Sequence, residues 1–384
     1  MTGIAFWTDN TQALDNLGDT VQLEFSYMLF SDIVQQVGEY DWQVVDDLLD
    51  DITGRGHQAI LRFRYTYPGY TAVSVPDSIA NSASYRIMID KVENQDTFLP
   101  DWSNAALQDF SLQFFVDFAA RYDGDPRLAM LQVGFGSYAE YHLYDGPVSL
   151  GRNFPSKPFQ ESFFEVMIAN FTSTQWSVSI DAANDEYSPL ADNSALKNAH
   201  FALFDDSFMH ETHSNNNAEY NRASWLFFGT DRYHASMLGG EFNYYSDYDQ
   251  QHVLSLPNGP WGRSFESFAE QYNFSYIIGN EQYAYQSAAR IKQASLATGY
   301  KFNIDSFAAS STQTSVTISN TGIAPIYYDA YPAIDGTRSP ISLKGLLPGQ
   351  SLDFEFAVGG SAPVLSIQSD HLVAEQSIEY SADL

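Results

Sequence analysis

The sequence predicts an α/β protein: a (β/α)₈ TIM barrel followed by a small all-β sandwich of the immunoglobulin-like kind. Apolar segments typical of strands alternate with helical patterns eight times, which is the sequence signature of such a barrel. From residue 303 the helical periodicity vanishes, and short strands separated by turn residues follow. The 384 residues also exceed the roughly 250 that a barrel needs. We therefore expect a barrel domain over residues 1–302 and a sandwich domain over residues 303–384.

The expected elements of the barrel follow one another in order. The eight strands are expected near residues 4, 25, 61, 132, 178, 203, 239 and 276. One helix is expected to have Asp41 as its N-cap, another to have Ser103, and a third to open at Pro158. The last barrel helix is expected over residues 285–298. Residues 66–100 form an unusually long connection, which indicates a binding loop over a pocket.

The third expected strand, residues 58–65, carries two arginines on one face. Alternation places Arg62 and Arg64 on one side of the strand and Leu61 and Phe63 on the other. Two arginines on one strand face require anionic partners. In the sandwich, strands are expected over residues 315–319, 326–330, 351–356 and 374–380, separated by Asn320-Thr321-Gly322, Asp335-Gly336 and Pro348-Gly349.

The chain is strongly acidic. It has 48 acidic and 18 basic residues, a formal net charge of −30 at neutral pH. Such a charge repels phosphate backbones and anionic membrane surfaces, so we expect neither nucleic acid nor a membrane as a partner. It suits a salty setting, such as that of a marine bacterium, where screening weakens self-repulsion.

Several sequence features are absent. The chain has no cysteine, which excludes disulfides, zinc–thiolate sites and thiol nucleophiles. No apolar run approaches the roughly 20 residues of a membrane helix, and the N-terminus lacks a basic region followed by an apolar one. Met1 leads at once into a strand-like segment, so the protein is either cytoplasmic or a secreted or periplasmic protein whose signal peptide has been removed. The abrupt opening favours the second, which we expect.

Aromatic residues are abundant. They make up 15% of the chain, with 25 Tyr and 28 Phe, more than a core of this size uses. Tyrosines on loops suit a cleft for sugars, because ring faces stack on the apolar faces of pyranoses while hydroxyls bond their rims. We therefore expect a carbohydrate as the partner.

Two glutamates occupy matching positions. Glu140 lies in the segment of residues 131–142 and Glu241 in that of residues 237–243, and in each an apolar strand with glycines leads to a Glu among aromatics. They follow the expected fourth and seventh strands, at the carboxyl ends where barrel active sites lie. The alternative is that both are solvated loop residues.

Two such carboxylates can cleave a glycosidic bond. One gives a proton to the leaving oxygen, and the other meets the oxocarbenium-like carbon; at a separation of about 5 to 5.5 Å the configuration is retained. An alternative second carboxylate, in place of Glu241, is one of the pair Asp205 and Asp206, expected at the end of the sixth strand.

The pattern resembles that of clan A glycoside hydrolases. The segment Ala139-Glu140-Tyr141-His142, the opening Gly3-Ile4-Ala5-Phe6-Trp7 and the sandwich tail are similar to a group of bacterial barrel proteins with a Gly-Glu-Trp-His motif. The resemblance covers nearly the whole chain and implies that Glu140 is the acid/base and Glu241 the nucleophile. Ala139 departs from the clan, which has Asn there to bond the sugar 2-hydroxyl, so that contact must come from elsewhere, for example His142.

Further residues are candidates for substrate binding. They are Trp7, Arg62, Arg64, Tyr138, His142, Asp181, Asp205, Asp206, His210 and Tyr244. Arg64, with Arg62 as a second choice, is expected to keep Glu241 ionised or to bind a sulfate or carboxylate on the substrate. Alternatively, Arg62 belongs to a polar layer of the barrel and His142 is structural.

No metal or other cofactor is expected for catalysis. The segment His210-Glu211-Thr212-His213 lacks the two-residue gap of a zincin helix, and loop-like residues follow it. Acidic loops are suited at most to a structural Ca²⁺, although no EF-hand pattern occurs. There is also no phosphate-binding Gly-rich loop and no Gly-x-Ser-x-Gly elbow.

Together these features predict a retaining glycoside hydrolase that acts on a polysaccharide or oligosaccharide. The acidic surface, the two arginines and the aromatic excess extend the prediction to an anionic, sulfated algal glycan. The main alternative is a non-catalytic carbohydrate-binding protein on the same scaffold. A third possibility is a structural or adhesion module that acts through its β-sandwich.

Overall fold

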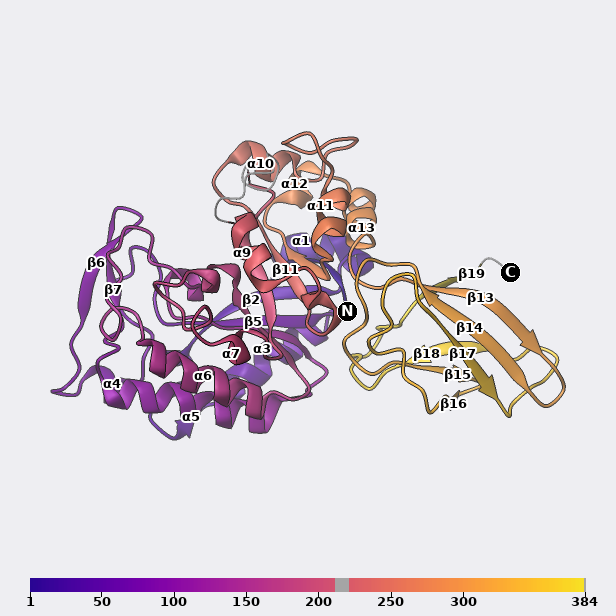
Figure 1. Ribbon diagram of the computed structural model, residues 1–384, viewed down its shortest axis with the longest axis horizontal. Coiled ribbons are helices and arrows are strands. Elements are labelled where there is room, and N and C mark those ends of the chain that lie inside the picture. The colour runs from indigo at the N-terminus through magenta and orange to yellow at the C-terminus, as the bar shows by residue number, and fades with distance from the viewer. Residues whose placement is uncertain (211–220, 383–384) are drawn as a thin grey trace.

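A closed barrel of parallel strands forms the larger part of the molecule (Figure 1). The computed structural model describes residues 1–210 and 221–382. The barrel strands are β1 (Gly3–Trp7), β2 (Leu23–Leu29), β5 (Gln58–Arg64), β8 (Leu128–Gln132), β9 (Gln175–Ser179), β10 (Ala202–Phe208), β11 (Leu238–Phe242) and β12 (Tyr276–Ile278). They close in the order β1-β12-β11-β10-β9-β8-β5-β2. The predicted eight-stranded barrel is confirmed, and each strand lies where the sequence placed it.

Helices and two small hairpins cover the barrel. The helices are α1 (Thr11–Leu17), α2 (Phe30–Ile33), α3 (Gln43–Thr53), α4 (Asp77–Ala80), α5 (Ala105–Tyr122), α6 (Lys157–Asn170), α7 (Ser194–Lys197), α9 (Asn221–Phe228), α10 (Asp247–His252), α11 (Phe265–Tyr272), α12 (Gln282–Tyr285) and α13 (Ala288–Ser295). Short 3₁₀ turns are η1 (Gly18–Thr20), η2 (Ser137–Ala139), η3 (Ile180–Ala183) and η4 (Arg232–His234). The hairpins pair β3 (Val34–Gln36) with β4 (Glu39–Tyr40) and β6 (Met88–Val92) with β7 (Gln95–Leu99). Within the described residues, no helix combines the length and apolar character that crossing a membrane requires.

Two helix starts differ from the prediction by one residue. The N-cap of α5 is Asn104 and not Ser103: the Asn104 side-chain oxygen accepts from the Leu107 amide at 3.1 Å. Trp42, not Asp41, occupies the N-cap position of α3, and the Asp41 carboxylate accepts from the Gln43 amide at 3.3 Å. At α5, Ser103 and Asn104 are both residue types that cap helices, so composition alone does not decide between them.

The last predicted barrel helix is two helices. Instead of one helix over residues 285–298, α12 ends at Tyr285 and α13 begins at Ala288. Ser287 separates them, because its hydroxyl accepts from the Arg290 amide at 3.2 Å and so caps the second helix. By contrast, Pro158 lies in the first turn of α6, as predicted.

The sandwich comprises two small antiparallel-rich sheets with their own apolar core. One sheet has the order β17-β14-β13-β19 and the other the order β16-β15-β18. Their bounds are β13 (Phe302–Ala309), β14 (Thr314–Asn320), β15 (Tyr331–Ile334), β16 (Thr337–Arg338), β17 (Ser351–Phe356), β18 (Leu365–Gln368) and β19 (Tyr380–Ala382). This confirms the predicted fold class, whereas the domain boundary at residue 303 stays a prediction.

Two predicted sandwich strands are wrong because those segments contact the barrel. Residues 326–330 contain no strand: the Tyr327 hydroxyl donates to the Tyr233 carbonyl at 2.7 Å, and the Tyr328 hydroxyl donates to the Ala129 carbonyl at 2.8 Å. Residues 374–379 likewise form no strand, since β19 begins only at Tyr380, and the Gln376 side chain donates to the Gln22 carbonyl of the barrel domain at 3.4 Å. Ala129 lies near the amino end of β8, so the sandwich packs at the end of the barrel opposite the carboxyl ends of its strands, beside the chain's N-terminus (Figure 1).

A buried charge cluster stabilises the start of the barrel. Glu24 on β2 is fully buried. Its carboxylate accepts hydrogen bonds from Arg55 at 2.8 Å and from Thr8 at 2.7 Å, and it lies 2.7 Å from the His57 ring nitrogen. Burial raises the pKa of the Glu24 carboxyl, but its hydrogen bonds to Arg55, His57 and Thr8 outweigh burial and lower the pKa below its ordinary value. The ionised carboxylate therefore contributes to stability.

We expect Glu24→Gln to lower the free energy of unfolding by about 3 kcal/mol at neutral pH, because it removes the buried carboxylate that Arg55, His57 and Thr8 share. Since the folded-state pKa lies below the unfolded one, the contribution is complete above the unfolded value, about pH 4, and is lost as the pH falls through the folded value. Urea unfolding of the unmodified chain and of Glu24→Gln between pH 3 and pH 7 measures this contribution. A difference in unfolding free energy that does not shrink toward low pH contradicts this account, and so does an equal effect of the exposed control Glu39→Gln.

Candidate active site at the barrel mouth

A pocket of about 220 Å³ opens at the carboxyl ends of the barrel strands. The residues that line it are Trp7, Tyr27, Tyr67, Glu93, Tyr138, Glu140, Tyr144, Asp206, Glu241, Tyr244 and Tyr245. They are aromatic or acidic without exception. The pocket therefore combines ring faces for apolar contact with carboxylates that can hold or move protons.

Glu140 is held by a loop that doubles back on the end of β8. A Cβ atom on Gly134 would lie 2.1 Å from the Ala139 carbonyl oxygen, and one on Gly136 would lie 2.2 Å from the His142 carbonyl oxygen. The Gly136 amide donates to the Glu140 carbonyl at 2.8 Å, which closes the loop. Only glycine permits this close approach of two backbones, so the loop depends on both glycines.

The same loop contains backbone strain. Tyr138 and Ala139 have φ angles of 60° and 58°, in the left-handed region that other residues than glycine rarely occupy. Such conformations cost on the order of 1–3 kcal/mol each and persist only where the surrounding structure imposes them. Here they turn the chain so that Glu140, eight residues beyond the end of β8, faces the pocket.

Glu241 lies within β11 and not after it, one residue before the strand's end. The glycines before it allow close packing: a Cβ on Gly240 would lie 2.4 Å from the Asp205 carbonyl oxygen of the neighbouring β10, and one on Gly239 would meet the Tyr276 ring. The side chain of Glu241 is buried and lines the pocket.

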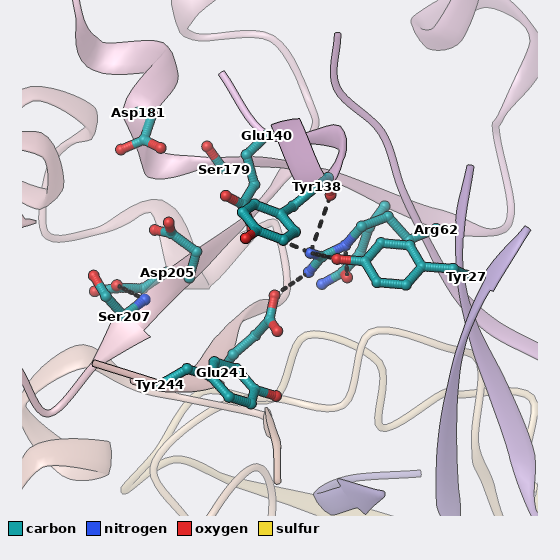
Figure 2. A network of polar contacts seen from close by, with 12 residues as sticks. Tyr27, Arg62, Tyr138, Glu140, Ser179, Asp181, Asp205, Ser207, Glu241 and Tyr244 are labelled. Carbon is teal, nitrogen blue, oxygen red and sulfur yellow. Dashed lines mark hydrogen bonds and ion pairs between the residues drawn. The ribbon is translucent and has the colours of Figure 1, made fainter. Parts of the chain in front are cut away.

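Arg62 joins the two glutamates at the floor of the pocket. One terminal nitrogen of its guanidinium donates to Glu140 Oε1 at 3.3 Å, and the other donates to Glu241 Oε1 (Figure 2). The Arg62 Nε donates to the Gln132 side chain at 2.8 Å. The Arg62 side chain is fully buried, with the Phe204 ring 4.3 Å below it. Both carboxylates thus converge on one guanidinium group.

Burial dominates the electrostatics of both glutamates. It raises the pKa of Glu140 well above the ordinary value, and the nearby Asp206 raises it further against the opposing effects of His142 and Arg62. Burial also raises the pKa of Glu241, which the charge and hydrogen bond of Arg62 lower in part. The two largest effects on Glu140, burial and the Asp206 charge, both raise its pKa, whereas Arg62 opposes burial at Glu241, so Glu140 is the better proton carrier and Glu241 the better carboxylate.

His142 sits among three carboxylates. Its Nε2 lies 2.7 Å from Glu140, 3.5 Å from Asp181 and 3.6 Å from Asp206. Burial lowers the pKa of His142, but the three acids outweigh it and raise the pKa well above the ordinary value. The ligand atoms of these four residues all lie within 4.8 Å of one another, so they are also a group that can hold a metal ion.

The structure separates the predicted substrate-binding residues into three groups. Trp7, Tyr138, Asp206 and Tyr244 line the pocket, and the Trp7 ring nitrogen donates to the Tyr244 hydroxyl at 3.4 Å. Arg62, His142 and Asp181 lie behind the lining, in contact with its carboxylates.

The remaining three are not among the residues that line the pocket. Asp205 faces away, since its carboxylate accepts from the Trp225 ring nitrogen at 2.9 Å and from the Asn221 amide at 2.7 Å. Asp205 is therefore not an alternative to Glu241. The pair Asp205–Asp206 was also predicted to end the sixth strand, but β10 continues to Phe208. His210 packs against Tyr245.

Arg64 was predicted to hold Glu241 ionised, and this is wrong. Its guanidinium carbon lies 4.7 Å from the centre of the Tyr67 ring and 4.9 Å from that of Tyr70, and it forms no ion pair among the described residues. Arg62 forms the bond to Glu241 instead. Residues two apart on a strand are displaced by about 6.6 Å, so only one of the two arginines can reach the pocket floor.

Several lining residues were not singled out from the sequence. Tyr67 and Glu93 lie on the connection over residues 66–100, which was predicted as a binding loop, and Glu93 accepts from the Tyr138 hydroxyl at 2.8 Å. Tyr144 and Tyr245 each follow a glutamate by four residues, two residues beyond the ends of the matching segments 131–142 and 237–243. Of the His210-Glu211-Thr212-His213 segment, residues 211–213 lie outside the described residues.

Comparison with known proteins gives only distant similarities. No family model and no curated protein matches the chain. One similar solved structure is a GH5_18 protein from Streptomyces cattleya in complex with Manb1-4GlcNAc, with 10% identity, a TM-score of 0.44, and 72% of this chain and 70% of that chain covered. A GH20 exo beta-N-acetylglucosaminidase from Vibrio harveyi has 9% identity, a TM-score of 0.39 and coverage of 77% and 53%. A noncanonic maltogenic alpha-amylase, AmyB, from Thermotoga neapolitana has 8% identity, a TM-score of 0.38 and coverage of 96% and 98%. At this level the similarities say nothing about the reaction.

Proposed function

We propose that the protein is a retaining glycoside hydrolase, with Glu140 as acid/base and Glu241 as nucleophile. The observation that supports this most is the convergence of the two carboxylates, from the loop after β8 and from β11, on the single guanidinium of Arg62 beneath an aromatic pocket. A shared guanidinium favours the shorter carboxylate separation of retaining enzymes over the longer one that leaves room for a water molecule.

The proposed reaction has two steps. Glu140 gives its proton to the leaving oxygen as the bond between that oxygen and the anomeric carbon breaks, while the Glu241 carboxylate forms an ester bond to the same carbon. A water molecule then attacks that carbon and gives a proton to Glu140, and the ester breaks. Both glutamates return to their initial states, and two inversions leave the configuration unchanged.

The aromatic walls support a sugar as the substrate. The rings come from several strand ends: Trp7 is the last residue of β1, Tyr244 and Tyr245 follow β11, and Tyr67 and Tyr138 come from the loops after β5 and β8. Ring faces bind the apolar faces of a pyranose, and the phenol groups can bond its hydroxyls. We therefore propose an oligosaccharide or polysaccharide as substrate.

The charge of the pocket bears on the predicted sulfated glycan. Four carboxylates line the pocket, and no Lys, Arg or His is among its lining residues in the described part of the chain. Arg62 is engaged by Glu140 and Glu241, and Arg64 by tyrosine rings. A sulfate in this pocket would meet like charge without a free cation, so we propose a neutral or cationic sugar at this position.

A panel of glycans tests the proposal. Purified protein incubated with neutral, amino-sugar and sulfated oligosaccharides is expected to release reducing ends from at least one neutral or amino-sugar substrate, since those match the charge of the pocket. Cleavage confined to sulfated glycans would contradict the proposed substrate class. Binding of sugars without any cleavage would support the non-catalytic alternative.

A further inference from the structure

We propose that Glu140, His142, Asp181 and Asp206 form a binding site for one divalent transition-metal ion. This inference goes beyond the hydrolase function and does not rest on it. The four residues come from the ends of three neighbouring barrel strands: the loop after β8, the 3₁₀ turn η3 after β9, and β10 itself. Their ligand atoms lie within 4.8 Å of one another, and all four side chains are at least nine-tenths buried.

Two carboxylates share one ring hydrogen. His142 Nε2 lies 2.7 Å from a Glu140 oxygen and 3.6 Å from an Asp206 oxygen, but a ring nitrogen carries at most one hydrogen. A second observation concerns Asp206: its side chain is only 6% exposed, yet its buried Oδ1 has no hydrogen-bond partner among residues 1–210 and 221–382. A buried carboxylate oxygen without a donor is unfavourable unless a cation meets it.

The charges of the surrounding residues do not balance either. Arg62 is shared between Glu140 and Glu241, so it cannot neutralise the other acids. A His142 ring that binds the ion is neutral, so among the described residues the four buried carboxylates, including that of Glu241, face the single positive charge of Arg62. A divalent ion supplies two further positive charges.

The donor set selects the class of ion. One imidazole nitrogen and three carboxylate oxygens suit Mn²⁺ or Zn²⁺, since imidazole favours transition metals and carboxylates accept them. Donors about 2.0–2.2 Å from an ion lie at most about 4.4 Å apart, close to the spread of this group, so small rotations of the side chains suffice. The Tyr144 ring packs 3.8 Å from the His142 ring and limits the movement of the imidazole.

The ion and the hydrolytic reaction compete for Glu140. A carboxylate that binds a divalent ion cannot at the same time carry the proton that the leaving oxygen needs. The two proposals therefore describe separate states of one site. Measuring the binding of the ion, and not turnover, keeps the failure of one distinguishable from the failure of the other.

Metal titration of the full chain tests the site. Protein stripped with a chelator and dialysed is titrated calorimetrically with MnCl₂, ZnCl₂, CaCl₂ or MgCl₂, and the bound metal is measured. We expect one Mn²⁺ or Zn²⁺ per chain, with a Kd at least about tenfold larger in Asp206→Asn or Asp181→Asn. The control Asp353→Asn removes an equal charge from the exposed surface of the sandwich and is expected to bind as the unmodified chain does.

A spectroscopic measurement keeps the test independent of whether the variants fold. Pulsed electron paramagnetic resonance of Mn²⁺ bound to the unmodified chain is expected to show coupling to one imidazole nitrogen, and His142→Gln is expected to remove it. No stoichiometric Mn²⁺ or Zn²⁺ at about 1 mM, a preference for Ca²⁺ or Mg²⁺ over both, equal binding by folded Asp206→Asn, or bound Mn²⁺ without nitrogen coupling would overturn the proposal.

Discussion

Glu241→Gln is expected to lower kcat by roughly 10⁴-fold or more while sugar binding changes little, because the amide keeps the shape of the side chain but cannot form the ester. Glu140→Gln is expected to lower kcat by roughly 10²- to 10⁴-fold on a substrate whose leaving oxygen needs a proton. The loss in Glu140→Gln should be smaller on an aryl glycoside with an acidic phenol, whose leaving group departs without that proton.

The matched control is Glu93→Gln, another carboxylate of the same pocket, which contacts Tyr138 and not Arg62. It is expected to alter KM more than kcat, because its contact is with the wall of the pocket and not with the reacting centre. Kinetics and calorimetric binding of an oligosaccharide, measured on all three variants, separate the outcomes. Unaltered turnover in both Glu140→Gln and Glu241→Gln would show that these residues are not the catalytic pair.

Arg62→Met is expected to lower the free energy of unfolding by about 3–5 kcal/mol at neutral pH, because it leaves two buried glutamates without their shared cation. The same change removes the influence that lowers the pKa of Glu241, so more of Glu241 is protonated and kcat falls as well. Urea unfolding followed by circular dichroism measures the first effect, and initial rates measure the second.

Arg64→Met is the matched control for this experiment. Arg64 lies two residues along the same strand and contacts tyrosine rings in place of carboxylates. The loss of such cation–π contacts costs about 0.5–2 kcal/mol, less than the loss of a shared buried ion pair. If the two arginine variants lost equal stability, Arg62 would not be the residue on which the buried pair depends.

The barrel was predictable from sequence because its signal is local and repeated. Each strand is a short apolar run, and each is followed by a helix or a turn, so eight weak signals reinforce one another. Helix caps were less predictable, as Ser103 and Asn104 show: both residue types cap helices, and the geometry of the entering chain decides between them. No strand forms at residues 326–330 or 374–379, because these segments contact the barrel instead. No local sequence pattern encodes such contacts.

The candidate site was predictable only in part. Placing Glu140 and Glu241 at strand ends required only the order of the strands, which the sequence indicates. The choice between Arg62 and Arg64 required the depth of each residue in the barrel, and the choice between Asp205 and Asp206 required the direction of each side chain. The group around His142 brings together residues from three strand ends, and its convergence emerges only from the closed barrel.

Proton NMR of the first product tests the central claim most directly. A β-linked oligosaccharide that the protein cleaves is followed from the first minute, before the released sugar exchanges between its anomers in water. Two carboxylates that act by double displacement release the product with its original anomeric configuration. Retention at the earliest time points is therefore the expected result, whereas first release of the opposite anomer would contradict the roles assigned to Glu140 and Glu241.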